Sequence, residues 1–585
     1  MKSFLKNVLA NIVAIVLLCV VFFFFFIVML VFSAMGNEKT AVVKKNSVLA
    51  INLKTNIIDS PTEERKGLFD ISDQNKSILI YDAVEAIRKA KTDDNIKGIS
   101  IEADQLSAGI TQIDDLRSAI EDFKKSGKFV YAYGNAVSQS SYYLGSVADR
   151  YYLNPAGMIE LKGLATEVAF FKDFADKYGI GIEVIRHGKF KSAVEPFLRN
   201  DISPENKEQL GTLLNDIWRN TSSKMAVSRK IDTAQFRTVI DSLYGMIPEL
   251  GVKYRLADQL IQKTQYDDLI KSKLGVKKDE KLNKISLGKY IASYSDDEKS
   301  GDRVAVLYAS GSINSGDEYN DIHSEKYIKY IKELQENDKV KAVVFRINSP
   351  GGSANASDEI LFELQQLKKK KPLVVSFGDY AASGGYYIAM AADKIYSEPN
   401  TLTGSIGVFG VIPYFKDIAN KNGIRADIVA TNANSQYYSS LNGVSPYGVS
   451  MITRSVEGTY KRFVHFVTQN RKQTFEQIDS VGGGRVWSGT RAKQIGLVDE
   501  LGTLNDAVKY AAGKAGLKSY VLSSYPKRMS PFEQIFKDLN EDEISARLIK
   551  NKIGKANYEI MQHVMEERKL QSEVKMEMPY QIKID

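Results

Sequence analysis

An internal repeat with a spacing of 244 residues constrains the fold of this chain more than any other feature of its sequence. The segment Asp94–Glu102 aligns with Asp338–Arg346, and the same register holds without a gap as far as Gly179, which lies opposite Gly423. Because chance does not hold one register over about 90 residues, the repeat marks a duplicated structural unit. We therefore predict two copies of one fold in tandem.

The repeat divides the chain into five predicted segments. These are a short stub with an apolar anchor at 1–37, a first copy at 46–275, a linker at 276–300, a second copy at 301–520 and a charged tail at 525–585. The linker and the tail are assigned because both are rich in charged residues.

Each copy has the pattern of an α/β domain. In the second copy, Val340–Ile347 and Leu373–Phe377 are short apolar runs rich in β-branched residues, and Ser357–Leu367 between them has helical spacing. Short apolar strands that alternate with helices form buried, largely parallel sheets. We predict an α/β fold made of tandem crotonase/ClpP-like domains and preceded by one transmembrane helix.

Composition excludes several classes of protein. The 585 residues are 44% hydrophobic and 26% charged, as in a globular chain. The net charge of +8 comes without a long basic block in the body, so no nucleic-acid partner is expected. Cys19 is the single cysteine and the four histidines lack metal-ligand spacing, so we predict no intrachain disulfide, no metal and no cofactor.

The N-terminus carries an apolar run long enough to span a bilayer. Ile12–Phe32 contains 21 consecutive apolar residues, about 31 Å of helix. The apolar region of a cleaved signal peptide is shorter, about 7–15 residues. We therefore predict an uncleaved anchor that contacts lipid over residues 9–35. Lysines flank both ends of the run, so the charges alone leave its orientation open.

The two copies differ at two places where catalytic groups are expected. After the predicted strand Val340–Ile347 the second copy has Asn348-Ser349-Pro350-Gly351-Gly352, where the first copy has no Pro-Gly-Gly. Glycines in such a turn let backbone N–H groups approach a developing oxyanion.

A serine follows a later strand of the second copy. Ser383 lies at a strand-to-helix turn among small residues, and its counterpart in the first copy is Gln139. A serine before a helix is ordinarily an N-cap. With Pro-Gly-Gly about thirty residues upstream, we interpret Ser383 instead as a candidate nucleophile.

A serine nucleophile needs a base, and no histidine is well placed by sequence. His187 lies near a loop of interest, but no aspartate partner is recognisable, and His323, His465 and His563 have ordinary surface or packing contexts. The first copy instead offers Lys191, which the second copy lacks at the equivalent place. A lysine acts as a base only when neutral, which requires burial away from carboxylates. An average loop lysine is a solvated charge, so this interpretation depends on burial.

Four motifs in order resemble one family. They are Lys191-Ser-Ala-Val-Glu-Pro-Phe, Asn348-Ser-Pro-Gly-Gly, Ala382-Ser383-Gly-Gly-Tyr and Leu402-Thr-Gly-Ser-Ile-Gly-Val. Together with the anchor and the duplication, they resemble the long, duplicated form of the signal peptide peptidase A (protease IV) family, the S49 family of Ser-Lys serine peptidases. Pro-Gly-Gly alone is a weak signal because ClpP and crotonases share it. The tail beyond 525 matches no part of this family pattern.

The resemblance implies roles and a location. Ser383 would be the nucleophile and Lys191 the general base, in a membrane-anchored endopeptidase that degrades cleaved signal peptides and other apolar peptides. The enzyme would be a single-pass protein of the bacterial inner membrane, with its catalytic body on the periplasmic side.

Around this dyad the sequence suggests supporting groups. N–H groups of Gly351 or Gly352 and of Gly384 would form the oxyanion hole. Ser405 is a candidate to orient the lysine, and Asn348 with Ser349 would brace the glycine turn. Val408 and Phe409 are candidates to line a dry, apolar site. Lys189 is expected to face away from Lys191 in an extended segment.

Three questions stay open from sequence. A crotonase-like enzyme acting on a CoA thioester would use the same oxyanion turn, and a non-catalytic membrane scaffold would keep the same fold. A duplicated chain suggests a homo-oligomer, a tetramer-like ring of alternating half-domains. Whether Lys191 and Ser383 meet within one chain or between two chains is not determined by the sequence.

Overall fold

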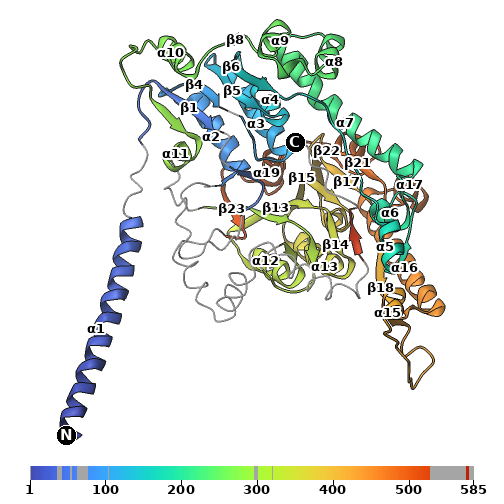
Figure 1. The fold of residues 1–585 in the computed structure, drawn as a ribbon. Coiled ribbons are helices and arrows are strands. Elements are labelled where there is room, and N and C mark those ends of the chain that lie inside the picture. The colour runs from blue at the N-terminus through green and yellow to red at the C-terminus, as the bar shows by residue number, and fades with distance from the viewer. Residues whose placement is uncertain are drawn as a thin grey trace.

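The computed structural model describes residues 2–35, 42–52, 56–61, 77–102, 104–294, 301–318, 321–527 and 575–578. Within these residues the chain forms two α/β bodies and a third sheet that joins them (Figure 1). The helix α1 (Lys2–Met35) extends away from both bodies.

The first copy is built around a six-stranded parallel sheet. Its order is β8 (Gln259–Leu260), β6 (Arg150–Ile159), β5 (Phe129–Val137), β4 (Ile96–Glu102), β1 (Ser47–Asn52) and β9 (Lys284–Ser286). Helices α2 (Ile80–Thr92) and α3 (Ile110–Lys124) bury their apolar faces in the same core as the central strands. The central strands β1 and β4 are buried at most of their positions, as a sheet covered on both faces requires.

The second copy repeats this arrangement in an eight-stranded sheet. Its main path is β21 (Val486–Ser488), β17 (Leu402–Gly404), β15 (Leu373–Ala382), β13 (Val340–Ser349), β10 (Arg303–Ser310) and β23 (Val521–Tyr525), with β16 (Lys394–Ser397) and β22 (Glu500–Leu501) joined beside β15. Pairing is parallel except between β17 and β21.

The helices of the second copy cover this sheet on both faces. Helices α12 (Ser324–Glu336), α13 (Ala354–Lys370) and α16 (Pro446–Arg471) contribute to one core with β13 and β15. Helix α19 (Leu504–Lys514) packs in a second cluster with alternate residues of β10 and β13. The strands are therefore buried from two sides.

The 244-residue spacing recurs in the strand starts. β4 begins at Ile96 and β13 at Val340, β5 at Phe129 and β15 at Leu373, and β6 at Arg150 and β16 at Lys394. The predicted duplicated α/β fold is therefore present. The predicted strands and helix of the second copy are also found, although β15 and α13 run further than expected.

Two predicted segment limits differ from the structure. Within the expected linker at 276–300, β9 pairs with β1 and α11 (Leu287–Ala292) packs in the core of the first copy. The apolar positions Ile285, Leu287 and Tyr290 explain this, since they are buried despite the charged residues around them. β23 lies just past the expected end of the second copy and pairs with β10.

A mixed sheet connects the two copies. Its order is β12 (Ile322–His323), β11 (Ile313–Asn314), β14 (Gly351–Ser353), β24 (Lys575–Glu577), β18 (Phe409–Tyr414) and β7 (Gly181–Arg186). β7 comes from the first copy and pairs antiparallel with β18 of the second, with Gly181 opposite Tyr414 and Arg186 opposite Phe409. This pairing fixes the position of the chain that follows β7 relative to the second copy.

Helix α7 (Pro204–Arg229) adds a second connection. Its first half lies beside β21, and its last turns pack in the core of the first copy through Met225 and Ala226 (Figure 1). Asp216 pairs with Arg491 and accepts a hydrogen bond from Ser488, while Gln209 accepts one from the backbone of Val486. One helix of the first copy is thus held along the edge of the second sheet.

A buried charge cluster adds a third connection. Arg346, on β13, has no exposed surface and donates to Asp59 of the first copy at 2.8 and 3.1 Å. Glu398 lies 3.5 Å from the same guanidinium, and Asp379 accepts two hydrogen bonds from Thr111 at 2.9 Å. Burial raises the pKa of Glu398 and of Asp379, because a carboxylate loses hydration there.

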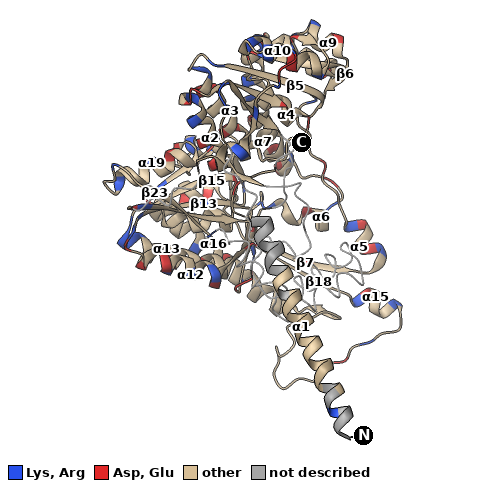
Figure 2. Cartoon of the chain, turned by 90° about the vertical axis from the view of Figure 1, so that its left-hand side faces the viewer, with Lys and Arg blue, Asp and Glu red and all other residues tan. Residues whose placement is uncertain are grey.

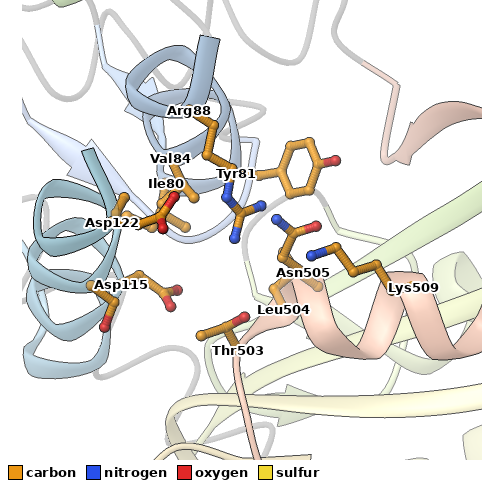
Figure 3. Close-up of a pocket in the computed structure, with 12 residues that line it drawn as sticks. Ile80, Tyr81, Val84, Arg88, Asp115, Asp122, Thr503, Leu504, Asn505 and Lys509 are labelled. Atoms are coloured by element: carbon orange, nitrogen blue, oxygen red, sulfur yellow. The ribbon is translucent and has the colours of Figure 1, made fainter. Parts of the chain in front are cut away.

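A cavity of about 290 Å³ lies between the copies. Its walls come from α2 and α3 on one side and from the start of α19 on the other, so that Arg88 and Asp115 face Asn505 and Lys509 (Figure 3). Lys191 and Ser383 are not among the described residues that line it.

The predicted membrane anchor is only partly described. α1 covers the apolar run, and its described side chains, such as Leu18 and Phe22, are exposed, with tan colour along most of its length (Figure 2). The side chains of Phe24 and of residues 27–35 are outside the part of the chain that the structure describes. Among the described residues, no helix meets the length and apolar character required to cross a membrane. Elsewhere in Figure 2, both signs of charge are interspersed over the body.

We expect Asp59→Ala to destabilise the protein by about 3 kcal/mol, because the buried Arg346 guanidinium would lose the carboxylate that accepts its hydrogen bonds and keep only the carboxylate of Glu398, at 3.5 Å. The measurement is the free energy of unfolding in urea. Asp201→Ala is the control, because Asp201 forms an exposed ion pair with Arg199. Its removal should lower the free energy of unfolding by about 1 kcal/mol or less. Equal losses for the two variants would show that the buried pair does not hold the copies together.

Candidate active site

Ser383 lies at the sharp turn between β15 and α14 (Gly384–Ile388). Its backbone has φ +54° and ψ −116°, a conformation that non-glycine residues rarely adopt. The turn is held by hydrogen bonds from Ser383 N to the Gly404 carbonyl and from Tyr387 N to the Ser383 carbonyl, both 2.8 Å. The Ser383 side chain makes no capping hydrogen bond, so it is not the N-cap that a serine at this place ordinarily forms.

The first copy shows the ordinary alternative at the equivalent turn. There Ser138 caps α4 (Gln139–Gly145) by accepting from Ser141 N. Gln139, the counterpart of Ser383, accepts hydrogen bonds from the backbone of Lys162 and Gly163. In the first copy, the side chains at this turn therefore cap a helix and hold a neighbouring loop.

Lys191 is brought to the turn by the chain that follows β7. The segment docks on a glycine loop of the second copy, where Phe190 N donates to the Gly483 carbonyl at 3.1 Å. Gly484 packs directly on Lys191, since a Cβ at Gly484 would lie 2.6–2.7 Å from the backbone and Cβ of Lys191. Arg186 Nη1 donates to the Lys191 carbonyl at 3.1 Å. The lysine backbone is thus fixed by both copies.

The Lys191 ammonium points at three oxygens. Its Nζ lies 2.9 Å from Ser383 Oγ, 3.0 Å from Ser405 Oγ and 3.3 Å from the Ser405 carbonyl. Lys191, Ser383 and Ser405 all have 0% exposed surface. Both members of the predicted dyad come from one chain in this structure, and Ser405 contacts the lysine as the sequence suggested.

Burial lowers the pKa of Lys191 from its usual 10.5 to about 7. The Glu577 carboxylate acts in the opposite direction and favours the charged form. The described hydrogen-bond partners of Nζ are hydroxyl and carbonyl oxygens, and the ring centroid of Phe409 lies 5.7 Å away. A substantial neutral fraction at neutral pH follows from this environment.

The predicted oxyanion turn faces the Ser383 turn. A Cβ at Gly351 would lie 2.8 Å from Gly384 N, and one at Gly384 would lie 3.2 Å from Gly352 N, so the three glycines form one close surface. Gly351 has φ +107°, which favours glycine. Gly351 N donates to Ser349 Oγ at 3.2 Å, which leaves Gly352 and Gly384 as the better donors to a substrate oxygen.

The predicted supporting residues lie around this turn. Asn348 Oδ1 accepts a hydrogen bond from Tyr380 N at 3.0 Å, and Ser349 accepts the one from Gly351. Both residues therefore brace the turn. Val408 and Phe409 are buried, with 0% and 7% exposure.

Other candidate bases are engaged elsewhere. His187 Nδ1 lies 2.7 Å from Glu457 Oε1, and its ring stacks on Tyr460. His323 Nδ1 contacts the Ser315 carbonyl at 3.0 Å. His563 lies outside the described residues. Lys189 is exposed, two residues from the buried Lys191.

Sequence reasoning missed two features of the site. Gly482-Gly483-Gly484 holds the lysine segment, and a run of three glycines was a usable signal. The strand β24, from the charged tail, lies against the glycine turn, with the Met576 carbonyl 3.1 Å from a Cβ position on Gly384. Nothing in the tail sequence indicated this contact.

Comparison with known proteins identifies the family to which each copy is similar. The model of peptidase family S49 matches residues 122–277 and 365–518, one match in each copy, and these hold Lys191 and Ser383 respectively. A Clp protease model matches residues 295–403. The chain has a ClpP-like, duplicated α/β fold.

Curated relatives extend over most of the chain. This chain is 36% identical to Protease 4 of Salmonella typhi over 512 residues, which cover 85% of this chain and 82% of the relative. Protease 4 of Haemophilus influenzae is 34% identical, covering 82% and 81%. The chloroplastic serine protease SPPA of Arabidopsis thaliana is 32% identical, covering 81% and 70%. The chain belongs to peptidase family S49, and it is a serine peptidase.

We expect Gly484→Ala to reduce peptidase activity roughly 100-fold, because the added Cβ would displace the Lys191 backbone from Ser383. The measurement is kcat/KM on a fluorogenic peptide. Gly423→Ala is the matched control, since Gly423 has a similar φ of +78° but no atom within 4 Å of its Cβ position. Comparable activity in the two variants would contradict the positioning role of Gly484.

Proposed function

We propose that the chain is a membrane-anchored serine endopeptidase in which Ser383 is the nucleophile and Lys191 the general base. The observation that carries this proposal is the 2.9 Å contact between Lys191 Nζ and Ser383 Oγ in a site with no exposed surface. Membership in a serine peptidase family favours this reaction over a CoA-thioester reaction and over a scaffold role.

The proposed reaction follows from the contacts of the dyad. Neutral Lys191 takes the Ser383 proton while Ser383 Oγ attacks the scissile carbonyl, and Lys191 then donates the proton to the leaving amine. N–H groups of Gly352 and Gly384 hold the oxyanion, a contribution of roughly 3–4 kcal/mol per donor in other hydrolases. Lys191 then activates the water that hydrolyses the acyl-enzyme.

Ser405 would orient the lysine in this scheme. Its hydroxyl and carbonyl both contact Nζ, and neither is a carboxylate that would fix the positive charge. Ser405 has φ +48°, and its N–H donates to the Arg485 carbonyl at 2.7 Å. The backbone of Ser405 is therefore held at the site by the chain around Arg485.

The proposed substrates are cleaved signal peptides and other apolar peptides at the cell membrane. The apolar run Ile12–Phe32 would anchor the chain in the bilayer, with the body on the periplasmic side. A dry groove around a neutral lysine disfavours a charged side chain on the acyl side of the scissile bond. The duplication further suggests a tetramer-like ring of this chain.

We expect Ser383→Ala and Lys191→Arg to lose at least about a thousandfold in kcat. The alanine removes the nucleophile, and an arginine does not deprotonate in a protein. Lys189→Ala should keep most of the activity, because Lys189 is exposed. The assay is hydrolysis of a fluorogenic peptide by the purified enzyme in detergent. Substantial turnover by Ser383→Ala or by Lys191→Arg would overturn the dyad.

The proposal also sets the pH dependence. The folded pKa of Lys191 is about 7, below its usual 10.5, so the neutral and active form increases as pH rises through about 7. We expect kcat/KM to increase from pH 6 to pH 8. A rate that peaks at acidic pH would exclude a lysine base.

A further inference from the structure

The C-terminal segment forms a strand inside the connecting sheet, next to the candidate active site. β24 pairs antiparallel with β14, with Gly352 opposite Met576 and Gly351 opposite Glu577. On its other side it pairs antiparallel with β18 at Phe409. Met578 N donates to the Pro350 carbonyl at 2.7 Å. An extended peptide therefore fills the space between the oxyanion turn and the strand after Ser405.

The side chains of this segment alternate as a half-buried strand requires. Met576 has 0% exposure and belongs to the core cluster that includes Ile406 and Val408. Met578 has 6% exposure and packs in the cluster that includes Ala382 and Leu402. Lys575 and Glu577, on the other face, are half-buried. The two methionines thus pack in two different apolar clusters, and each cluster includes a residue that precedes the nucleophile turn, Ala381 or Ala382.

The register of the segment relates it to the dyad. The Met576 carbonyl oxygen lies 2.1 Å from a Cβ position on Gly351 and 3.1 Å from one on Gly384, and Met576 is paired with Gly352, so the carbonyl lies against the glycine turn. The next residue, Glu577, is close enough to raise the pKa of Lys191. The Met576–Glu577 peptide bond is therefore presented with its carbonyl at the glycine turn and its following residue near the base.

We propose that residues 575–578 are a peptide ligand of the chain's own active-site groove and compete there with substrate. The geometry further assigns the Met576 pocket to the substrate side chain on the acyl side of the scissile bond. A long, unbranched apolar side chain would fit this pocket. This inference rests on the proposed Ser383–Lys191 peptidase. Substrates would bind as the same antiparallel strand between β14 and β18, with main-chain pairing for affinity and pockets for specificity.

A purely structural role for β24 makes a different prediction. A strand that only completes a sheet would contribute to stability, and its loss would not improve substrate binding. A ligand in the groove lowers the apparent affinity of every competitor, because only the unoccupied fraction binds substrate. The two roles are distinguished by measuring KM, which changes when a competing ligand is lost, and the melting temperature, which changes when a structural strand is lost.

The test uses Met576→Asp in the full-length chain, with Met576→Leu as the matched control. An aspartate would be desolvated without a partner in the apolar pocket and should expel the strand. We expect KM for a fluorogenic peptide with methionine on the acyl side to fall at least about fivefold in Met576→Asp, with kcat little changed. Met576→Leu should behave as the parent chain.

A second measurement does not depend on turnover. A labelled peptide Glu-Val-Lys-Met-Glu-Met-Pro-Tyr, the sequence of residues 573–580, is titrated into the Ser383→Ala/Met576→Asp double variant and followed by anisotropy. We expect the peptide to bind the double variant more tightly than it binds Ser383→Ala, whose own tail is unchanged. A peptide with aspartate at the position of Met576 should bind the double variant much more weakly.

An unchanged or raised KM in Met576→Asp, no peptide binding, or a large loss of melting temperature without a change in KM would overturn the proposal. Full activity in Ser383→Ala would instead refute the proposed function, and the anisotropy result would remain interpretable on its own.

Discussion

The desolvation of one lysine is the constraint on which the rest of the site depends. Lys191 has no exposed surface, and its amine is surrounded by the oxygens of Ser383 and Ser405. An ammonium in that environment loses hydration and gains no carboxylate hydrogen bond among the described contacts, so its pKa falls towards neutral pH. A histidine is not required when burial supplies a neutral amine.

This burial requires that two copies of one fold be locked together. The lysine belongs to the first copy and the serine to the second, so a small relative movement would admit water or lengthen the contact. The β7–β18 ladder, the contacts of α7 and the Arg346–Asp59 pair hold the copies in register. Gly484 then allows the lysine segment to approach closely. Lys191 therefore comes from one copy and Ser383 from the other, and Gln139 stands at the place in the first copy that Ser383 has in the second.

Much of the fold could be predicted because buried parallel strands are continuous apolar runs. The strand starts at Val340 and Leu373 were predicted from such runs, and the duplication placed their counterparts in the first copy. Ser383 and Lys191 were identified by comparing the copies, and the family resemblance assigned their roles. Whether the two residues meet within one chain was not predictable, because that depends on the long-range pairing of β7 with β18.

The remaining features depend on contacts that leave no local pattern. Lys575–Met578 alternates apolar and charged residues over too short a stretch to distinguish it within a charged tail. The 276–300 segment looked like a linker because it is rich in charged residues, yet its apolar residues Ile285, Leu287 and Tyr290 are buried. Arg346 in an apolar strand was a usable signal of a buried ion pair, but its partner Asp59 is 287 positions away.

The most direct test of this account is a measurement of the pKa of Lys191 itself. The protein is labelled with ¹³C at the lysine ε-carbon in the Ser383→Ala background, and the resonance is assigned by its loss in Lys191→Met. Titration of its chemical shift should give a midpoint near pH 7, well below that of the exposed lysines. A midpoint near 10.4, as for a solvated lysine, would contradict the claim that burial makes this residue a base.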